Sequence, residues 1–378
     1  MRTSLIMRNA TLNLMFAAMP VSAATRYVTV TGAGVADCSD WSDACTLSTA
    51  LSTAGSGDDV WVVAETYSGT IDLVNGVKIV GGFAGSETAA SQSDPITNQT
   101  VIDGGGTGVS VTSTDDAGST MLRGFRITNG HNSAGLTSDT GGGAATLVNS
   151  SAMFVQCVFD GSSSASFGEA VYVRGSGGPE FVNCTFNNNG AVDFGSGTVT
   201  PIAGGAVYVH SGSPRFTNCL FTNNTGMEAG AMAIGDGTPT LVNCTITGNN
   251  STVGYGGGLY DPESKAQVKN CILWANTAVR GNDELENYPG RFTVVSKSDV
   301  AGGFVGTGNI DSDPLFVGAS DFHLQGTSPC KNAGQTMALP LDIADLDWDG
   351  NTTEQTPLDL ALKQVNLDGF FVVAARDS

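Results

Sequence analysis

Basic residues are scarce in this sequence. There are 16 Lys and Arg against 36 Asp and Glu, which gives a formal net charge of −20 at pH 7. A surface of this sign repels phosphate backbones and anionic headgroups, so it argues against nucleic acid as a partner and against electrostatic attachment to a membrane. The acidic excess mainly favours solubility. Histidine is rarer still, with three residues, too few for a zinc site that does not also use cysteine.

Long apolar runs are missing after the first 24 residues. A membrane-spanning helix needs about 20 consecutive apolar residues, so no transmembrane span is expected. The beginning of the chain is different, because Arg2 and Arg8 precede a short apolar run and Val21-Ser22-Ala23 fits the small-x-small pattern of a cleavage site. The sequence therefore predicts a secretory signal over residues 1–23, and an extracellular or cell-surface location for the rest.

Cysteine marks an internal repeat. Five of the eight cysteines follow one another at intervals of 27, 35, 25 and 27 residues, a period typical of solenoids. Each lies in the pattern apolar-x-Asn-Cys-x-apolar, with Gln in place of Asn in the first copy. The five copies are residues 154–159, 181–186, 216–221, 241–246 and 268–273. An earlier copy at 121–127 has Gly124 in place of the cysteine.

The apolar positions of this pattern are the first, fourth and sixth, whereas strand alternation would place the first, third and fifth on one face. The pattern therefore predicts a bend at the third position, where Asn tolerates the left-handed backbone conformation that such bends need. We expect the asparagines at this position to lie above one another and to join their amides along the stack. They are Asn183, Asn218, Asn243 and Asn270.

A second element, rich in small residues, precedes each copy. It occupies residues 142–147, 168–173, 204–209, 229–234 and 256–261, and begins 12 or 13 residues before the next copy. The other arc, from each cysteine to the next small-residue element, varies from 10 to 20 residues. Insertions are therefore expected in one loop of one face, where solenoids often carry their function.

These repeats predict an all-β chain folded as a right-handed parallel β-helix, with two or three short strands per rung and rungs about 4.8 Å apart. Residues 46–54 carry Leu and Ala at helical spacing and predict a short N-terminal capping helix. We expect one solenoid domain over residues 24–334, with closing rungs around 314–316 and 322–324. An acidic irregular tail follows over residues 335–378.

The cysteines outside and inside the repeats predict different roles. Cys38 and Cys45 flank Trp41 in a polar loop and are a candidate disulfide. The five repeat cysteines are expected to fill the interior as small apolar residues, and disulfides between successive rungs are the alternative. Cys330 is left over near the end of the chain.

Distinctive segments open and close the repeat region. The opening segments are DDVWVVAE at 58–65, IVGGFAGSET at 79–88 and VIDGG at 101–105, and the closing ones are DPLF at 313–316, FHL at 322–324 and SPCKNAG at 328–334. They resemble segments of exported bacterial right-handed β-helix proteins, often surface proteins of the choice-of-anchor type. GGAV at 204–207 and FTNNT at 221–225 are similar to the GGA[I/V/L] and FxxN repeats of polymorphic outer-membrane proteins. The resemblance implies an exported solenoid displayed at the cell surface.

No catalytic set known from polysaccharide-degrading β-helices is complete in this sequence. Asp58-Asp59 and Asp115-Asp116 have no partner motifs of the polygalacturonase type, and Tyr260-Asp261-Pro262 lacks the His of the mannuronan epimerase signature. The carboxylates of the rungs do not recur in register, as a calcium-dependent lyase with an Arg or Lys base would need. We therefore expect no catalytic residues. A polysaccharide lyase or glycoside hydrolase is the alternative.

An acidic loop near the end of the chain is a candidate calcium site, and no cofactor is otherwise expected. Its Asp-x-Asp-x-Asp-Gly spacing lets alternate oxygens converge on Ca²⁺. The twelfth position of the loop is Thr356 rather than the usual bidentate Glu, and a solvated acidic turn is the alternative. The candidate ligands are Asp345, Asp347, Asp349, Asn351 and Glu354.

The small-residue element also predicts a binding surface. Because inward and outward residues alternate along a strand, one outward residue of each copy should join a column on the outside of the stack. The column consists of Tyr172, Tyr208, Ala233 and Tyr260, with Arg174 and His210 two residues further on the same face. Aromatic faces beside hydrogen-bond donors suit sugar rings. The alternative is that these tyrosines only cover neighbouring strands.

The resulting functional prediction is a non-catalytic protein that binds polysaccharide or a cell-surface glycan, in adhesion or surface display. An enzyme that degrades an extracellular polysaccharide remains the alternative. The two differ in whether an acid, a base or a metal set is built into the rungs.

Overall fold

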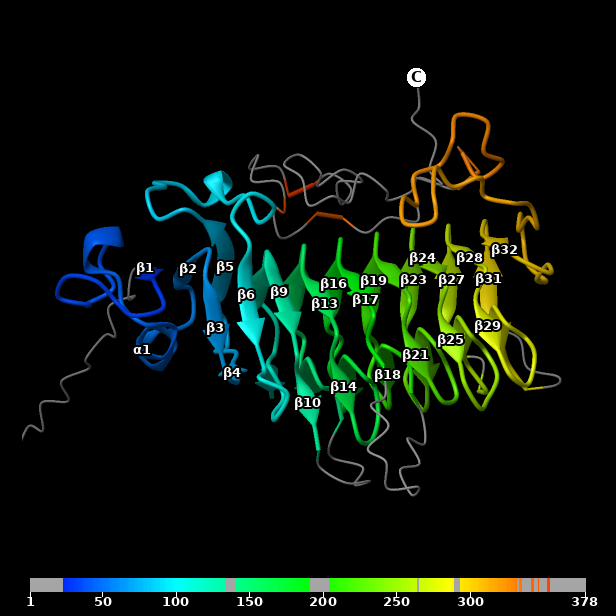
Figure 1. Cartoon of the computed structure of the whole chain (residues 1–378), viewed down its shortest axis with the longest axis horizontal. Helices are drawn as coiled ribbons and strands as arrows, with labels where there is room; N and C mark the ends of the chain where they lie inside the picture. Colours follow the sequence, from blue (N-terminus) through cyan, green and yellow to red (C-terminus); the bar gives the residue numbers. More distant parts are fainter. Residues whose placement is uncertain are drawn as a thin grey trace, which may run out of the picture.

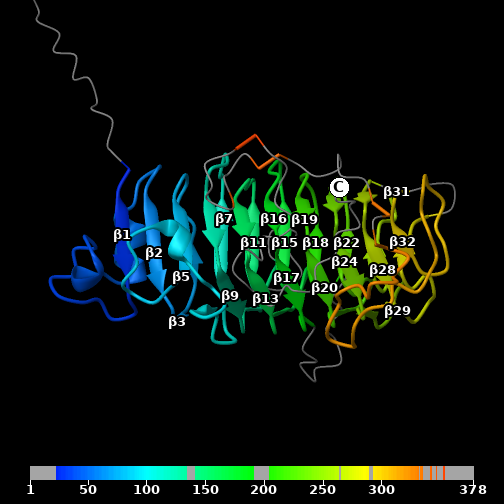
Figure 2. The ribbon, with the colours of Figure 1, turned by 90° about the horizontal axis from the view of Figure 1, so that it is seen from above.

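The chain coils into a stack of parallel strands that form three long sheets (Figure 1). The computed structural model describes residues 23–133, 141–190, 204–263, 265–288, 293–331, 333–334, 341–342, 346 and 352–353. Seen from above, the strands follow one another along a single axis from β1 to the β31 and β32 end (Figure 2). The architecture is a right-handed parallel β-helix, which confirms the predicted fold class.

The three sheets are named A, B and C here. Sheet A contains β1 (Thr25–Val28), β2 (Asp59–Val63), β5 (Lys78–Phe83), β8 (Met121–Arg123), β12 (Met153–Val155), β16 (Glu180–Val182), β19 (Arg215–Thr217), β23 (Thr240–Val242), β27 (Gln267–Lys269) and β31 (Val294–Ser296). Sheet B contains β3 (Thr66–Ser68), β6 (Thr100–Asp103), β9 (Phe125–Thr128), β13 (Val158–Asp160), β17 (Thr185–Asn187), β20 (Leu220–Thr222), β24 (Thr245–Thr247), β28 (Ile272–Trp274) and β32 (Asp299–Val300). Sheet C contains β4 (Ile71–Asp72), β7 (Val111–Thr114), β11 (Ala145–Val148), β15 (Val171–Arg174), β18 (Val207–Val209), β22 (Met232–Ile234), β26 (Leu259–Tyr260) and β30 (Leu285–Glu286).

Each rung passes from sheet A to sheet B through a tight bend, and from sheet B to sheet C through a longer turn. Short strand pairs lie in that longer turn. They are β10 (His131–Asn132) with β14 (Ser163–Ser164), and the row β21 (Thr225–Gly226), β25 (Asn250–Ser251) and β29 (Thr277–Ala278). The loop of variable length therefore follows this turn, between sheets B and C, where the sequence predicted the insertions.

The bend between sheets A and B has the backbone conformation that the repeat predicted. Asn183, Asn218, Asn243 and Asn270 have φ values of 52–54°, and Gln156 has 50°. In the copy without cysteine the sequence alignment was one residue off. The register places Gly124, with φ 74°, level with Gln156 at the bend, and Phe125 rather than Gly124 level with Cys157. The left-handed residue redirects the chain, so positions four and six of the pattern face the interior together with position one.

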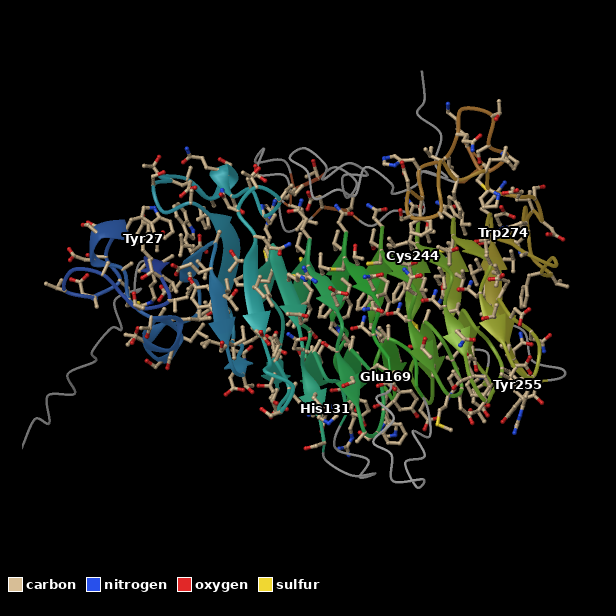
Figure 3. All side chains as sticks on the ribbon, in the orientation of Figure 1. Tyr27, His131, Glu169, Cys244, Tyr255 and Trp274 are labelled. Atoms are coloured by element: carbon tan, nitrogen blue, oxygen red, sulfur yellow. A yellow bond between two sulfur atoms is a disulfide. The ribbon has the colours of Figure 1, made fainter. Side chains whose placement is uncertain are left out.

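The interior is filled by stacked rows of cysteine and phenylalanine. The five repeat cysteines are buried and unbonded, and each thiol lies against a backbone carbonyl of the preceding rung, as Cys184 does with Phe154 at 3.3 Å. Figure 3 shows Cys244 within the stack. The phenyl rings stack nearly parallel from rung to rung, with centroids 4.8 Å apart for Phe181 and Phe216. The cysteines thus occupy the core as small apolar residues.

An amide ladder joins successive rungs, but it is not the row that the sequence predicted. Neither amide atom of Asn243 at the bend has a hydrogen-bond partner, so the predicted row is interrupted there. What the asparagines at the bend have in common is their left-handed backbone conformation. The ladder lies in the turn from sheet B to sheet C and consists of Asn189, Asn224, Asn249 and Asn276.

The ladder amides all point the same way along the stack. The Nδ2 groups of Asn189, Asn224 and Asn249 each donate to the Oδ1 of the next rung at 2.9–3.0 Å and to a backbone carbonyl of the preceding rung. The row begins at Ser162, whose backbone N–H donates to Asn189 Oδ1 at 3.1 Å. It ends at Glu284, whose carboxylate accepts the backbone N–H and the Nδ2 of Asn276. Burial raises the pKa of Glu284 to about 7.

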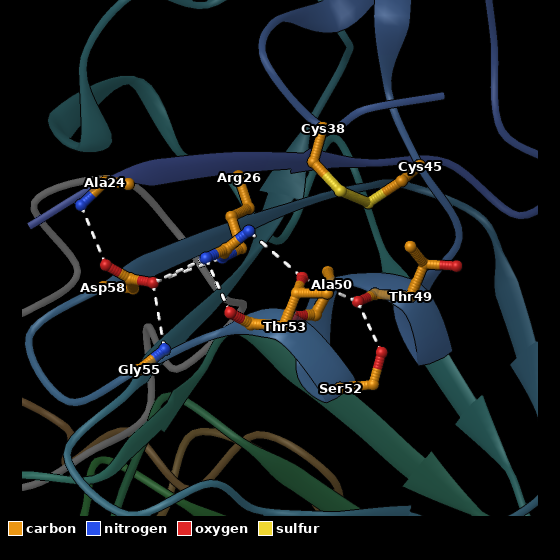
Figure 4. A network of polar contacts seen from close by, with 10 residues as sticks. All are labelled: Ala24, Arg26, Cys38, Cys45, Thr49, Ala50, Ser52, Thr53, Gly55 and Asp58. Carbon is orange, nitrogen blue, oxygen red and sulfur yellow. Dashed lines mark hydrogen bonds and ion pairs between the residues drawn. A yellow bond between two sulfur atoms is a disulfide. The ribbon is translucent and has the colours of Figure 1, made fainter. Parts of the chain in front are cut away.

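The N-terminal end is closed by α1 (Leu47–Thr53), which buries Leu47 and Ala50 over the first rung as predicted. The side chain of Thr46 caps this helix by accepting the N–H of Thr49. Arg26 of β1 ties the helix to the stack, because its guanidinium donates to the Thr53 carbonyl at 2.8 Å and pairs with Asp58 at 3.0 Å (Figure 4).

A loop before α1 completes this N-terminal cap. Cys38 and Cys45 form a disulfide there, with Cα atoms 4.7 Å apart. Two short 3₁₀ turns, η1 (Trp41–Asp43) and η2 (Ala90–Gln92), flank the same end. Trp41 packs edge-on against Tyr27 at 4.8 Å, so the loop and the first strand bury their aromatic rings together.

The other end is closed differently from the sequence prediction. β31 and β32 form the last rung in sheets A and B, and the segments around 314–316 and 322–324 add no further rung. They pair through an antiparallel bridge between Phe316 and Leu324 and pack, with Cys330, over Ile272 and Trp274 on the outside of sheet B. The reason is their apolar content, because Phe316 and Phe322 pack against Ile272 of β28 and keep this apolar side chain from water.

Part of the predicted tail lies against the outside of sheet A. Leu346 is buried against Met121, Val155 and Val182, and its carbonyl accepts a hydrogen bond from Arg123 at 2.6 Å. The predicted signal, apart from Ala23, and most of the tail lie outside the described residues. Within the described part of the chain, no helix is long and apolar enough to cross a membrane.

Candidate functional site

The outer face of sheet C carries a column with one residue from every rung. The strand register aligns, in spatial order, Asp72, Thr112, Thr146, Tyr172, Tyr208, Ala233, Tyr260 and Glu286. The four residues that the sequence placed in one column are therefore adjacent. Parallel strands in register lie about 4.8 Å apart, so a ligand lying along the column would contact several rungs.

The tyrosines of the column do not all reach solvent. Tyr208 and Tyr260 are partly exposed, whereas Tyr172 is fully buried. Tyr172 is overlain because Phe167, from the loop before β15, stacks on it at 6.2 Å and on Tyr208 at 4.9 Å. The prediction that Tyr172 contacts a ligand is therefore wrong for this conformation, and its ring instead supports Tyr208, 6.0 Å away.

Ala233 interrupts the aromatic column between Tyr208 and Tyr260. It is fully buried, as is Ala229, and the rings of Phe167, Tyr208 and Tyr260 all pack against these two alanines. Two aromatic rings thus flank a position without a side chain beyond Cβ. The two tyrosines are two rungs apart, a separation of about 10 Å.

His210 and Arg174 follow Tyr208 and Tyr172 by two residues in the chain and lie at the edge of this aromatic surface. His210 Nδ1 is 3.1 Å from the hydroxyl of Tyr172, and the imidazole stacks beside Tyr208 at 6.1 Å. Burial, and then the charge of Arg174, lower the pKa of His210, so the ring is neutral at pH 7. A neutral imidazole offers both a donor and an acceptor for hydroxyl groups.

Acidic groups surround the Tyr260 end of the column. The Tyr260 hydroxyl lies 3.4 Å from that of Tyr288 and hydrogen-bonds Glu228. Burial raises the pKa of Glu228, although Arg280 and Tyr260 oppose this shift. Glu228 therefore retains its proton to a higher pH than an exposed Glu, which suits hydrogen bonding or proton donation.

Glu169 is a buried carboxyl beneath this surface that the sequence reasoning did not single out. It is fully buried, and Figure 3 shows it beside the middle rungs. One oxygen accepts the N–H of Ser164 at 2.8 Å, and the other has no hydrogen-bond partner. Burial raises the pKa of Glu169 to about 8. The sequence did mark Glu169 as unusual, because the other four copies of the small-residue element have Gly at this position.

The remaining predicted site residues do not join this surface. The Cys38–Cys45 disulfide belongs to the N-terminal cap. The candidate calcium ligands Asp345, Asp347, Asp349, Asn351 and Glu354 lie outside the described residues. Among the residues that the structure does describe, no group of three His, Cys, Asp or Glu side chains is placed to hold a metal ion.

The sequence matches the family model described as "Right handed beta helix region" over residues 73–298. This is more than half of the chain, and the protein belongs to that family. Among solved structures, the crystal structure of pectate lyase Pel9A is similar, with 13% sequence identity over 83% of this chain and 92% of that one, and a TM-score of 0.49. A likeness at this level does not bear on activity. No curated protein matches the chain.

Proposed function

We propose that the protein binds polysaccharide along the outer face of sheet C, outside the cytoplasm and in association with the cell surface. The main observation behind this proposal is the arrangement of the aromatic column, in which the partly exposed rings of Tyr208 and Tyr260 lie on either side of the small, buried Ala233. Sugar rings present apolar C–H faces to aromatic rings and hydroxyl groups to neighbouring donors and acceptors. His210 supplies such a group beside Tyr208.

The location part of this proposal is supported by the sequence. Residues 1–23 have the pattern of a secretory signal, and the GGA and FxxN repeats are similar to those of surface proteins. A solenoid suits binding without catalysis, because successive rungs repeat one surface along an extended ligand. Adhesion or surface display would use the same contacts.

Affinity electrophoresis in gels containing soluble polysaccharides tests the binding site. Tyr208→Ala should weaken binding of the retarding polysaccharide about tenfold, which corresponds to about 1.4 kcal/mol, because a stacking face is removed. Tyr260→Ala should act similarly. Thr112→Ala is the matched control, since Thr112 lies in the same column away from the tyrosines. Equal mobility of all variants in every gel would contradict the proposal.

A second candidate function is favoured by Glu228. A carboxyl with a raised pKa beside an aromatic surface is a candidate general acid for glycoside cleavage. Incubation with polyuronides and neutral polysaccharides, with and without Ca²⁺, measures new chain ends. Product that disappears in Glu228→Gln, with binding retained, would assign an enzyme. Absence of product from a folded, binding-competent sample would leave the non-catalytic function.

A further inference from the structure

A groove lies on a different part of the stack from the aromatic column, where sheet B ends and the turn toward sheet C begins. It is a groove of about 520 Å³ lined by Asp103, Asn129, His131 and Ser163, together with four glycines that include Gly161. These residues come from β6, β9 and β13 and the turns that follow them, which are neighbouring rungs. The groove therefore runs along the stack axis for about 10 Å.

The groove lies where two of its three rungs have glycine at the first position after sheet B, Gly104 and Gly161, on either side of Asn129. The strand register aligns Asn129, Gly161, Asn188 and Asn223 at the first position after sheet B. All four have a left-handed backbone, with φ of 51°, 65°, 54° and 54°. Asn adopts this left-handed conformation in the flanking rungs, so the backbone does not require glycine at position 161. The effect of Gly161 is to leave space on the surface where the neighbouring rungs have an Asn side chain.

The walls of the groove carry hydrogen-bonding groups with spare capacity. One oxygen of Asp103 accepts the Gly105 N–H at 2.8 Å and the Asn129 Nδ2 at 3.2 Å. Among the described residues, the other Asp103 oxygen and the Asn129 Oδ1 have no hydrogen-bond partner. His131 Nδ1 is 2.9 Å from the Ser163 hydroxyl, which orients the imidazole at the groove wall. Figure 3 shows His131 at this edge of the stack.

The charges of the groove lining favour an uncharged ligand over an anionic one. Burial lowers the pKa of His131, so its ring is neutral at pH 7, and no Lys or Arg lines the groove. The one charged group is the Asp103 carboxylate, within a chain of net charge −20. Uronates and phosphates are therefore repelled, whereas hydroxyl groups can donate to Asp103 and Asn129.

We propose that this groove is a second binding site, which takes an uncharged, hydroxyl-rich sugar segment across three rungs. The site is separate from the aromatic column on sheet C, and its existence does not depend on the function proposed for that column. Two sites on one rigid stack would let a single long chain, or two neighbouring chains, be held at once, with the gain in retention that bivalency gives.

The three histidines allow one sample to report on both sites. Labelling the full chain with [13Cε1]histidine gives three signals, from His131 in the groove, His210 at the aromatic column and His323 in the closing segment, where it pairs with Asp321. The probes are neutral cello-, xylo- and mannohexaose, with oligogalacturonate as the charged comparison. We expect a neutral hexaose to shift the His131 signal in a saturable way, and His323 to stay still.

A matched pair of variants tests the groove itself. Gly161→Asn fills part of the groove with the residue that the neighbouring rungs have at this position. An added Cβ meets only the Thr128 hydroxyl, at 3.8 Å. Gly248→Asn makes the same change at the equivalent position outside the groove, where φ is +67°. Gly161→Asn should raise the Kd reported by His131 at least tenfold, and Gly248→Asn should leave it unchanged.

The outcomes separate the two sites. A His131 signal that no neutral hexaose moves at millimolar concentration, or that moves equally in Gly161→Asn, overturns the groove proposal. If His210 moves in that case, the aromatic column still binds. If His131 moves and depends on Gly161 while His210 does not move, the groove is supported and the sheet C proposal is contradicted. Both folded variants are checked by their melting temperatures.

Discussion

The buried carboxyl of Glu169 should make the stability of the protein depend on pH between about 5 and 8. Its pKa is about 8 in the folded chain, against 4.5 for the unperturbed group. Because the folded pKa is the higher one, folding takes up a proton in this range. The contribution of Glu169 is therefore most favourable below pH 4.5, and stability is lost as pH rises toward 8.

The size of the effect follows from the shift. Each unit of pKa difference corresponds to about 1.4 kcal/mol, and integration between pH 5 and pH 8 gives a loss of about 3 to 4 kcal/mol. Glu169 is fully buried, so solvent screening does not reduce this value much. Glu169→Gln keeps the shape and the acceptor for the Ser164 N–H but cannot ionise, so this part of the pH dependence should disappear.

The assay is urea unfolding followed by circular dichroism at pH 5, 6, 7 and 8. The quantity compared is the change in the free energy of unfolding with pH, because a constant offset from the new amide cancels in it. Glu65→Gln is the control, since Glu65 is an exposed Glu. A pH dependence that is the same in Glu169→Gln and the wild type would refute the assignment of a raised pKa to this carboxyl.

Three further predictions follow from other parts of the molecule. Asn224→Ala removes a ladder amide that makes four hydrogen bonds and leaves buried groups unpaired, so it should lower the free energy of unfolding by about 4 kcal/mol. Asn223→Gly, at the exposed neighbouring residue, should lower it by less than about 0.5 kcal/mol. Equal losses in the two variants would show that the ladder does not stabilise the stack. The six free cysteines are buried, so a thiol reagent such as DTNB should detect none in the native protein and six after unfolding without reductant; fast labelling of the native chain would contradict the packing of the cysteine row. If the acidic loop that contains Asp345, Asp347 and Asp349 binds Ca²⁺, limited proteolysis of the C-terminal tail should slow when the ion is added and not in Asp347→Ala, whereas unchanged cleavage of the wild type would exclude the site.

The backbone of the rungs was predictable because its causes are local. A pattern of apolar positions at one, four and six requires a bend, and Asn at position three satisfies it, as the φ of 52° at Asn183 confirms. The ladder was misplaced because both Asn rows recur with the same period. Only the geometry of the longer turn decides that the amide of Asn224, in the FxxN repeat, faces the next rung while that of Asn243 does not.

The surface features depended on contacts between distant parts of the chain. The register of Tyr172, Tyr208 and Tyr260 followed from the repeat, but the burial of Tyr172 comes from Phe167 in the loop of variable length. The groove at Asp103 and His131 could not be read from the repeat alone. It arises where Gly161 in one rung lies between longer side chains of its neighbours, which alignment in space reveals.

The one-directional amide row has a consequence for how such a protein can change length. Between Ser162 and Glu284 every rung presents one acceptor to the rung before it and one donor to the rung after it. A whole coil could be duplicated or deleted within this interval, and both terminal residues would still find partners. Glu284, which the register places level with Gly258, ends the row because its carboxylate accepts the last amide and has no N–H to offer to a further rung. Evolution could thus lengthen the molecule in steps of one coil without redesigning either end.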